Sequence, residues 1–151
     1  MTAVSVTTRT ATEADLDFLG GADRHVSPEV RAELVSLGRV LVAETDGGPA
    51  GFLRWGLFWD EIPFMNLLWV APEQRGRGVG TTLVAAWEQA QAAAGHHQVL
   101  TSTLASERAQ HLYRRLGYVD SGALLLPGEA TEIILRKPLG RSVPAAPGAT
   151  H

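Results

Sequence analysis

The sequence has no cysteine among its 151 residues. Disulfide bonds, thiolate zinc sites and a cysteine nucleophile are therefore excluded, and the composition fits a reducing compartment. No run approaches the roughly 18 uninterrupted apolar residues of a membrane-spanning helix, and the start lacks a basic segment followed by an apolar run. We expect neither a membrane partner nor a secretory signal, and we expect a cytoplasmic protein.

Basic residues are also fewer than acidic ones. The chain has 13 Lys and Arg against 16 Asp and Glu, a net charge of -3, whereas a nucleic-acid-binding protein would need an excess of basic residues. We expect no nucleic-acid partner, and the acidic balance weakly favours a cationic one. The length predicts a single domain, which we place at residues 1–139, followed by a disordered Pro/Ala/Gly-rich tail at 140–151.

Turn-forming residues divide the chain into strands and helices. Thr12, Ser27 and Ser106 are candidate helix N-caps, and Pro28 suits a first helical position. The expected helices are 13–19, 28–37, 79–94 and 107–116, and the expected strands are 4–9, 39–44, 50–59, 64–70, 99–104, 118–121 and 131–137. Strands outnumber helices, so we predict an α/β or α+β fold with a mixed sheet.

The most informative stretch is the glycine-rich loop at 75–80, which follows a strand and opens a long helix. N–H groups in the first turn of a helix lack internal partners and carry partial positive charge, so they favour an anion such as phosphate. A Walker loop is excluded because no Gly-Lys-Ser/Thr follows, and a dinucleotide fingerprint fails at Thr81. Phosphate binding and a basic turn whose glycines serve only geometry both remain open.

Two motifs carry a family resemblance. Arg75-Gly76-Arg77-Gly78-Val79-Gly80 matches the pattern Arg/Gln-x-x-Gly-x-Gly/Ala, and Ser106 to Tyr118 reads like Asn-x-x-Ala-x-x-Leu/Phe-Tyr-x-x-x-Gly-Phe, one strand later. The chain resembles the GCN5-related N-acetyltransferase (GNAT) family over residues 4–138. Ser106 replaces the usual Asn, which puts one cofactor contact in doubt, and Tyr118 replaces the common Phe.

The resemblance implies a mostly antiparallel sheet, flanked by helices, in which the strands at 64–70 and 99–104 are parallel but splay apart. Acetyl-CoA would enter that gap, with its pantetheine arm against the strand backbone and its pyrophosphate on the loop. The residues that the resemblance assigns to acetyl-CoA are Trp69, Val70, Arg75, Gly76, Arg77, Gly78, Val79, Gly80, Thr81, Ser106 and Tyr113.

Acyl transfer to an amine needs a neutral amine, and the departing thiolate needs a proton. Tyr113 resembles the family's general acid, although it also fits a core position. Asp60 and Glu61 are candidate bases, but an ordinary acidic turn is the stronger interpretation. The pair His96-His97 has no ligand partner at metal spacing, so no metal is expected.

Two further residues are candidates for acceptor binding. Trp59 would offer a π face to a cationic amine. Asn66 is expected to share a strand face with Leu68 and Val70, so it either points at the acceptor or bonds within the core. The segment 124–129 reads as a strand, a lid or a contact in a homodimer.

The sequence thus predicts an acetyl-CoA-dependent N-acetyltransferase that acts on an amine of a small molecule or peptide. A binding module that senses acyl-CoA without turnover is the alternative. The acceptor's identity is not encoded in any motif.

Overall fold

The computed structural model of the chain describes residues 5–140. Its strands are β1 (Thr7–Thr10), β2 (Val40–Thr45), β3 (Gly48–Phe58), β4 (Ile62–Val70), β5 (Gln98–Leu104), β6 (Val119–Leu124) and β7 (Glu132–Pro138). Its helices are α1 (Leu16–Ala22), α2 (Pro28–Ser36), α3 (Val79–Ala93) and α4 (Ala109–Arg115), with 3-10 turns η1 (Glu13–Asp15) and η2 (Pro72–Gln74). Residues 141–151 of the tail predicted at 140–151 lie outside the described residues, as does the start of the first predicted strand.

The described strands form one sheet in the order β1-β2-β3-β4-β5-β7-β6. Every neighbouring pair is antiparallel except β4 and β5, which are parallel. The predicted mixed sheet, mostly antiparallel with one parallel pair, is therefore confirmed. A parallel pair needs a crossover connection, which α3 supplies between β4 and β5.

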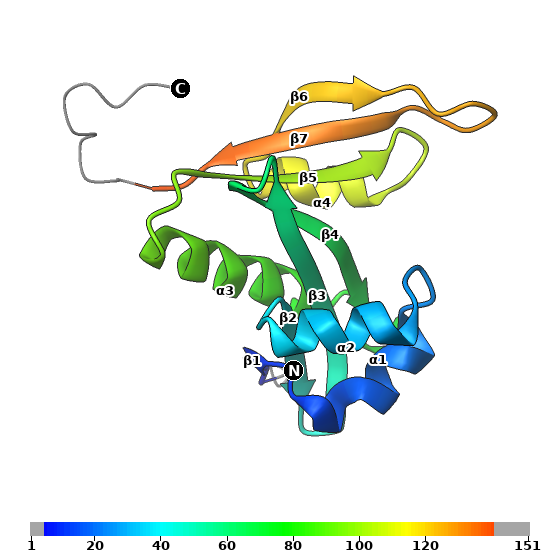
Figure 1. Cartoon of the computed structure of the whole chain (residues 1–151), viewed down its shortest axis with the longest axis vertical. Coiled ribbons are helices and arrows are strands. Elements are labelled where there is room, and N and C mark those ends of the chain that lie inside the picture. The colour runs from blue at the N-terminus through cyan, green and yellow to red at the C-terminus, as the bar shows by residue number, and fades with distance from the viewer. Residues whose placement is uncertain (1–4, 141–151) are drawn as a thin grey trace.

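The sheet is covered on both faces (Figure 1). Helix α3 buries Leu83, Val84 and Trp87 against one face, in a core that also contains Tyr113 of α4. Helices α1 and α2 cover the other face near β2 and β3, in a second core built around Phe52. Two apolar faces on one sheet explain why β2 and β3 read as nearly continuous apolar runs.

Local signals set most helix ends. Ser27 caps α2 by accepting a hydrogen bond from the Val30 N–H at 3.2 Å, with Pro28 in the first helical position as predicted. Thr12 caps the first turn as predicted, and Asp15 accepts from the Thr12 N–H at 2.8 Å in a capping box. The predicted end of the first helix is wrong, because α1 continues through Gly20 to Ala22.

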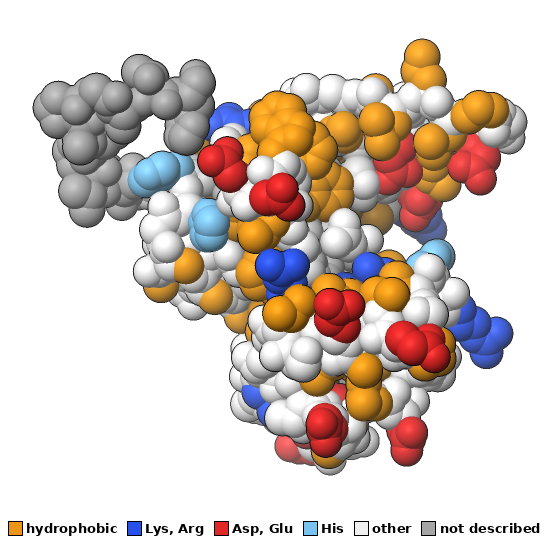
Figure 2. Space-filling view, viewed as in Figure 1, with side chains coloured by type: hydrophobic (Ala, Val, Ile, Leu, Met, Phe, Trp, Pro, Cys, Tyr) orange, Lys and Arg blue, Asp and Glu red, His pale blue; other side chains and the backbone are white. Residues whose placement is uncertain are grey.

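The sheet is divided at the β4–β5 boundary. Figure 2 shows a hollow in the surface between the part built on β1–β4 and the part built on β5–β7. Within residues 5–140, no helix has the length and apolar character needed to cross a membrane.

Candidate active site

The parallel pairing between β4 and β5 is short. It joins Phe64 with Leu100 and Met65 with Thr101, and no residue of β4 beyond Met65 pairs with β5. A β-bulge begins at the same place, because Arg54 faces Leu67 while Trp55 faces Met65, which leaves Asn66 as the extra residue. Bulges bend a strand and increase its twist. The bend therefore opens the sheet where the splayed pair was predicted.

The open edge of β4 presents backbone groups. The Ala71 N–H donates to the Ala50 carbonyl at 2.8 Å, and a methyl group on Gly51 would lie only 2.6 Å from the Trp69 carbonyl oxygen, so that carbonyl faces β3. The N–H and C=O groups of successive residues point to opposite edges of a strand. Those of Leu68 and Val70 therefore point away from β3, toward the gap between β4 and β5.

Val70 thus turns its backbone groups toward the gap, whereas Trp69 does not. The Trp69 carbonyl faces β3, and its indole stacks on Phe52 at 5.8 Å between ring centroids. The residue that joins Val70 on the open edge is Leu68, which the sequence reading did not include.

Beyond Val70, the glycine-rich loop leads into α3. Gly76 and Gly78 adopt positive φ angles of 77° and 84°, a region that favours glycine. The first backbone bond of the helix runs from the Thr82 N–H to the Gly78 carbonyl at 2.9 Å. The N–H groups of 79–81 therefore have no acceptor within the helix, and none elsewhere in the described part of the chain.

The charge around this helix start is positive. No acidic residue lies in the first turn of α3, and no side chain caps it. Arg75 and Arg77 are exposed beside it, and the Arg75 Nε donates to the Val70 carbonyl at 3.1 Å, which ties the loop to the end of β4. Free N–H groups, the helix dipole and two guanidinium groups together suit a phosphate anion.

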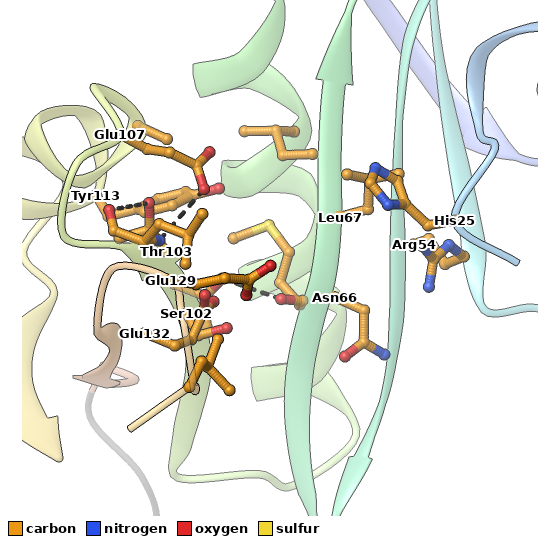
Figure 3. A pocket seen from close by; sticks show the side chains of 16 residues that line it. His25, Arg54, Asn66, Leu67, Ser102, Thr103, Glu107, Tyr113, Glu129 and Glu132 are labelled. Carbon is orange, nitrogen blue, oxygen red and sulfur yellow. Dashed lines mark hydrogen bonds between the residues drawn. The ribbon is translucent and has the colours of Figure 1, made fainter. Parts of the chain in front are cut away.

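A cleft occupies the space between the diverging strands, with a volume of about 410 Å³. We call it the β4–β5 cleft. Figure 3 shows its side chains. It is lined by His25, Arg54, Met65, Asn66, Leu67, Leu68, Thr101, Ser102, Thr103, Leu104, Glu107, Ala109, Tyr113, Leu126, Glu129 and Glu132.

Tyr113 lines this cleft and is only 5% exposed. Burial raises the pKa of Tyr113 to about 12; the Thr101 side chain opposes the rise and the Glu107 carboxylate adds to it. Its ring packs on Tyr118 with centroids 5.9 Å apart. The phenol is therefore protonated at neutral pH, which is the state that a proton donor needs and a base does not.

Asp60 and Glu61 lie elsewhere. They line a different pocket, between the β3–β4 turn and the α3–β5 connection, together with Trp59, His96 and His97. The turn precedes Ile62, whereas β4 and β5 diverge in the opposite direction, from Met65 toward Val70. The structure therefore does not bring Asp60, Glu61 or Trp59 to the β4–β5 cleft, and Trp59 is 74% exposed.

The expected face of Asn66 is wrong because of the bulge. Its amide nitrogen lies 3.3 Å from where a methyl group on Gly56 would be, whereas Leu68 and Val70 pack into the core under α3. Asn66 is exposed and reaches the cleft from β4 on the side of α1 and α2.

The expected cap at Ser106 is also wrong. Ser106 is an exposed turn residue, and α4 begins at Ala109 after Arg108. Polar side chains of other residues organise this turn: Gln110 Nε2 donates to the carbonyls of Ala105 and Glu107 at 2.8 and 2.9 Å.

Sequence reasoning missed the carboxylates of the cleft. Glu107 precedes α4, Glu129 lies in the β6–β7 loop and Glu132 starts β7. Glu107 lies within the second motif and Glu129 within the segment 124–129, but neither carboxylate was assigned a role from the sequence. The sheet order β4-β5-β7-β6 places β7 and the β6–β7 loop beside β5. Within residues 5–140, no three His, Cys, Asp or Glu side chains are grouped as a metal site would require.

The arginine that lines the cleft is already paired. Arg54 Nε donates to Asp23 at 2.6 Å, with Arg54 only 7% and Asp23 only 1% exposed. Asp23 also accepts from the His25 N–H at 3.1 Å. This buried ion pair holds the connection between α1 and α2 against β3, and it leaves the arginine's positive charge balanced by its carboxylate.

Comparisons with known proteins agree with this geometry. Residues 36–120 match the model of the acetyltransferase (GNAT) domain. The fold is similar to a GNAT-family acetyltransferase from Bacillus cereus, at 24% identity over 91% of this chain and 99% of that one, with a TM-score of 0.77. No curated protein sequence matches the chain.

Two other solved structures share the fold. One is the ribosomal-protein-S18-alanine N-acetyltransferase from Escherichia coli, at 18% identity over 97% of this chain and 100% of that one, with a TM-score of 0.75. The other is yncA from Salmonella typhimurium, solved with its cofactor acetyl-CoA, at 19% identity over 97% and 99% of the chains and a TM-score of 0.75. The family model covers more than half of the sequence, and this chain belongs to the GNAT acetyltransferase family.

Proposed function

We propose that this protein transfers an acetyl group from acetyl-CoA to an amine of a small molecule or peptide. One observation carries the proposal: the strands β4 and β5 part beside a helix start whose N–H groups at 79–81 have no internal acceptor. A helix start that suits an anion and an open strand edge then adjoin a cleft that contains a buried phenol.

The residues divide the binding work among them. The N–H groups of Val79, Gly80 and Thr81, with Arg75 and Arg77, would hold the pyrophosphate of the cofactor. The backbone of Leu68 and Val70 would pair with the pantetheine arm as a neighbouring strand does. Ser106 is in an exposed turn and its side chain makes no hydrogen bond within residues 5–140, so we assign it no main contact with the cofactor.

The bound cofactor supplies a thioester. The nitrogen of a neutral amine would form a bond to the acyl carbon while the carbon–sulfur bond breaks. The nitrogen would lose one proton to solvent water, the sulfur would take one proton from a donor in the cleft, and that donor would regain its proton from solvent. Tyr113 is the group in the cleft that is buried, protonated and able to give that proton. The backbone N–H of Val70, on the open edge, is the candidate donor to the oxyanion.

A thiol-release assay tests the proposal. The chain has no cysteine, so a thiol-reactive dye reports only coenzyme A released from acetyl-CoA. We expect release to depend on both the protein and an added amine, with the acetylated amine found by mass spectrometry in equal amount. Binding of acetyl-CoA without release, across an acceptor panel of small amines and peptides, would instead support a module that senses acyl-CoA.

A further inference from the structure

Thr101 joins the strands β4 and β5 at the point where they part. Met65 and Thr101 form the last pair between the two strands before the β4–β5 cleft opens. The Thr101 hydroxyl donates a hydrogen bond to the Met65 carbonyl at 3.0 Å, and Thr101 is only 1% exposed. A buried carbonyl without a partner is costly, so this bond holds the side chain in place. The Thr101 oxygen is therefore fixed where the cleft begins.

The same side chain faces Tyr113. Along β5, Val99 and Thr103 are buried on the face that α3 and α4 cover, so the alternation of the strand places Thr101 on that face too. Tyr113 belongs to the core on this face and lines the cleft with Thr101, and Figure 3 shows its ring on the same side of the cleft as Thr103. Burial raises the pKa of Tyr113 and the Glu107 carboxylate adds to the rise, whereas a hydrogen bond with the Thr101 side chain lowers it. The Thr101 hydroxyl thus meets both a strand carbonyl and the phenol.

A threonine hydroxyl has one proton to donate and two lone pairs that accept. While its proton lies on the Met65 carbonyl, Thr101 Oγ1 can accept a hydrogen bond from the neutral phenol. Once Tyr113 has lost its proton, the same hydroxyl can turn and donate to the phenolate. A donor that bonds the charged form stabilises that form, which is the direction in which Thr101 acts on the pKa of Tyr113. The phenol therefore has a hydrogen-bond partner in each of its two protonation states.

We propose that Thr101 is a positioning residue for Tyr113, which holds the phenol at the start of the cleft and stabilises the phenolate that proton transfer leaves. The inference rests on the proposed function, since it concerns the proton donor of the same reaction. In that step the phenolic O–H bond breaks as a proton passes to the departing sulfur, and the phenolate regains a proton from solvent. Thr101 keeps its own proton throughout and acts only through Tyr113.

The first test removes the hydroxyl while keeping the shape of the side chain. Thr101→Val lacks the hydroxyl, and Thr101→Ser keeps it but lacks the methyl group. With acetyl-CoA and the amine identified by the thiol-release assay, kcat of the full-length protein should fall by about 10- to 100-fold in Thr101→Val, the range of a hydrogen bond to a charged group. KM should change little, because Thr101 acts after both reactants are bound. Thr101→Ser should restore kcat to near the wild-type value, which a purely packing role would not produce.

Fluorine NMR gives a second readout that needs no turnover. The chain has two tyrosines, so a Tyr118→Phe background labelled with 3-fluorotyrosine reports Tyr113 alone, and the fluorine makes the phenol more acidic and easier to titrate. We expect the pKa of Tyr113 to be higher in Thr101→Val than with Thr101 present, since the phenolate loses its donor, and to return in Thr101→Ser. The control is Thr103→Val, because Thr103 is buried on the same face of β5 but bonds the Leu104 carbonyl at 3.4 Å. It should leave the pKa of Tyr113 unchanged.

The two readouts separate this inference from the proposed reaction. A pKa of Tyr113 that rises in Thr101→Val and returns in Thr101→Ser supports the positioning role even if no amine is acetylated, in which case only the proposed reaction fails. If Thr101→Val does not fold, Thr101→Cys takes its place in the titration, because a thiol is a weak donor. The inference is overturned if the pKa of Tyr113 is the same with and without the Thr101 hydroxyl, or if an active enzyme keeps its kcat in Thr101→Val.

Discussion

The two faces of the sheet present opposite charges around the β4–β5 cleft. On the side of α3 and α4, the positive charge comes from the N–H groups of 79–81 and from Arg75 and Arg77. On the side of α1 and α2, the negative charge comes from Glu129 and Glu132. The first set is mostly backbone and the second is entirely side chain.

That difference separates two tasks. Backbone donors at a helix start recognise a phosphate whatever the neighbouring side chains are, so they suit a cofactor common to a family. Side chains on a hairpin loop change readily without disturbing the core, so they suit an acceptor that differs among members. Each of the following variants changes a residue on one face of the sheet and leaves the other face unchanged.

The largest effect is expected from Tyr113→Phe on the α3/α4 side. Loss of the proton donor should lower kcat by roughly 10²- to 10⁴-fold, with little change in coenzyme A affinity. Steady-state rates and calorimetry measure the two quantities. Tyr118→Phe is the control, because Tyr118 lies behind Tyr113 and bonds Glu88 at 2.9 Å instead of lining the cleft. An unaltered kcat in Tyr113→Phe would show that Tyr113 is not the general acid.

On the α1/α2 side, Asp23→Asn should mainly affect stability. It leaves the buried guanidinium of Arg54 without its carboxylate, which costs about 3–5 kcal/mol of the free energy of unfolding. Denaturant unfolding measures the loss. The apolar pair Asp23→Leu/Arg54→Met is the control and should lose less, because no charge is left unpaired. Equal losses of unfolding free energy in the two variants would show that packing, and not the unpaired charge, causes the loss.

Gly80→Asp tests the backbone donors without removing them. A carboxylate in the first turn of α3 would repel the pyrophosphate, so coenzyme A affinity should fall by roughly 100-fold. Because a side chain at this position would face Leu68, Val70 and Leu112, the melting temperature should fall as well. Gly80→Ala is the control, since its methyl group would lie 3.6 Å from Leu68 and Val70, an ordinary contact. If Asp and Ala weaken binding equally, the loss is steric.

The smallest expected effect is on the pH at which the tyrosines ionise, which an absorbance titration measures. The two tyrosines of the chain, Tyr113 and Tyr118, are buried, and burial raises the pKa of each above its ordinary value near 10.0. The folded protein therefore keeps phenolic protons that the unfolded chain releases. The stabilisation is fully present below pH 10 and is lost as pH rises toward about 12. Absorbance titration of Tyr118→Phe follows Tyr113 alone, and phenolate formation near pH 10 in the folded state would contradict its burial.

The positive side of the site could be predicted from the sequence because its signals are local. The strand, the loop and the helix start at 64–80 follow one another, and the glycines of the loop adopt the positive φ angles that their residue type permits. The assignment of Tyr113 is local too, since it comes from the resemblance of Ser106 to Tyr118 to a family motif, and its role stays a prediction. The Ser106 cap failed because the side chains of Glu107 and Gln110 organise that turn.

The negative side could not be predicted, since it depends on contacts distant in sequence. Glu132 meets Leu104 only through the β5–β7 pairing, and Glu129 reaches β4 only because β7 lies between β5 and β6. The face of Asn66 was missed because one extra residue reverses the alternation of β4, and a regular strand pattern does not reveal a bulge.

A crystal structure of this protein with coenzyme A tests the central claim most directly. We predict pyrophosphate oxygens within hydrogen-bond distance of the backbone nitrogens of Val79, Gly80 and Thr81, with the pantetheine arm along Leu68 and Val70. The account is contradicted if the nucleotide binds elsewhere, or if those three nitrogens remain turned away from it.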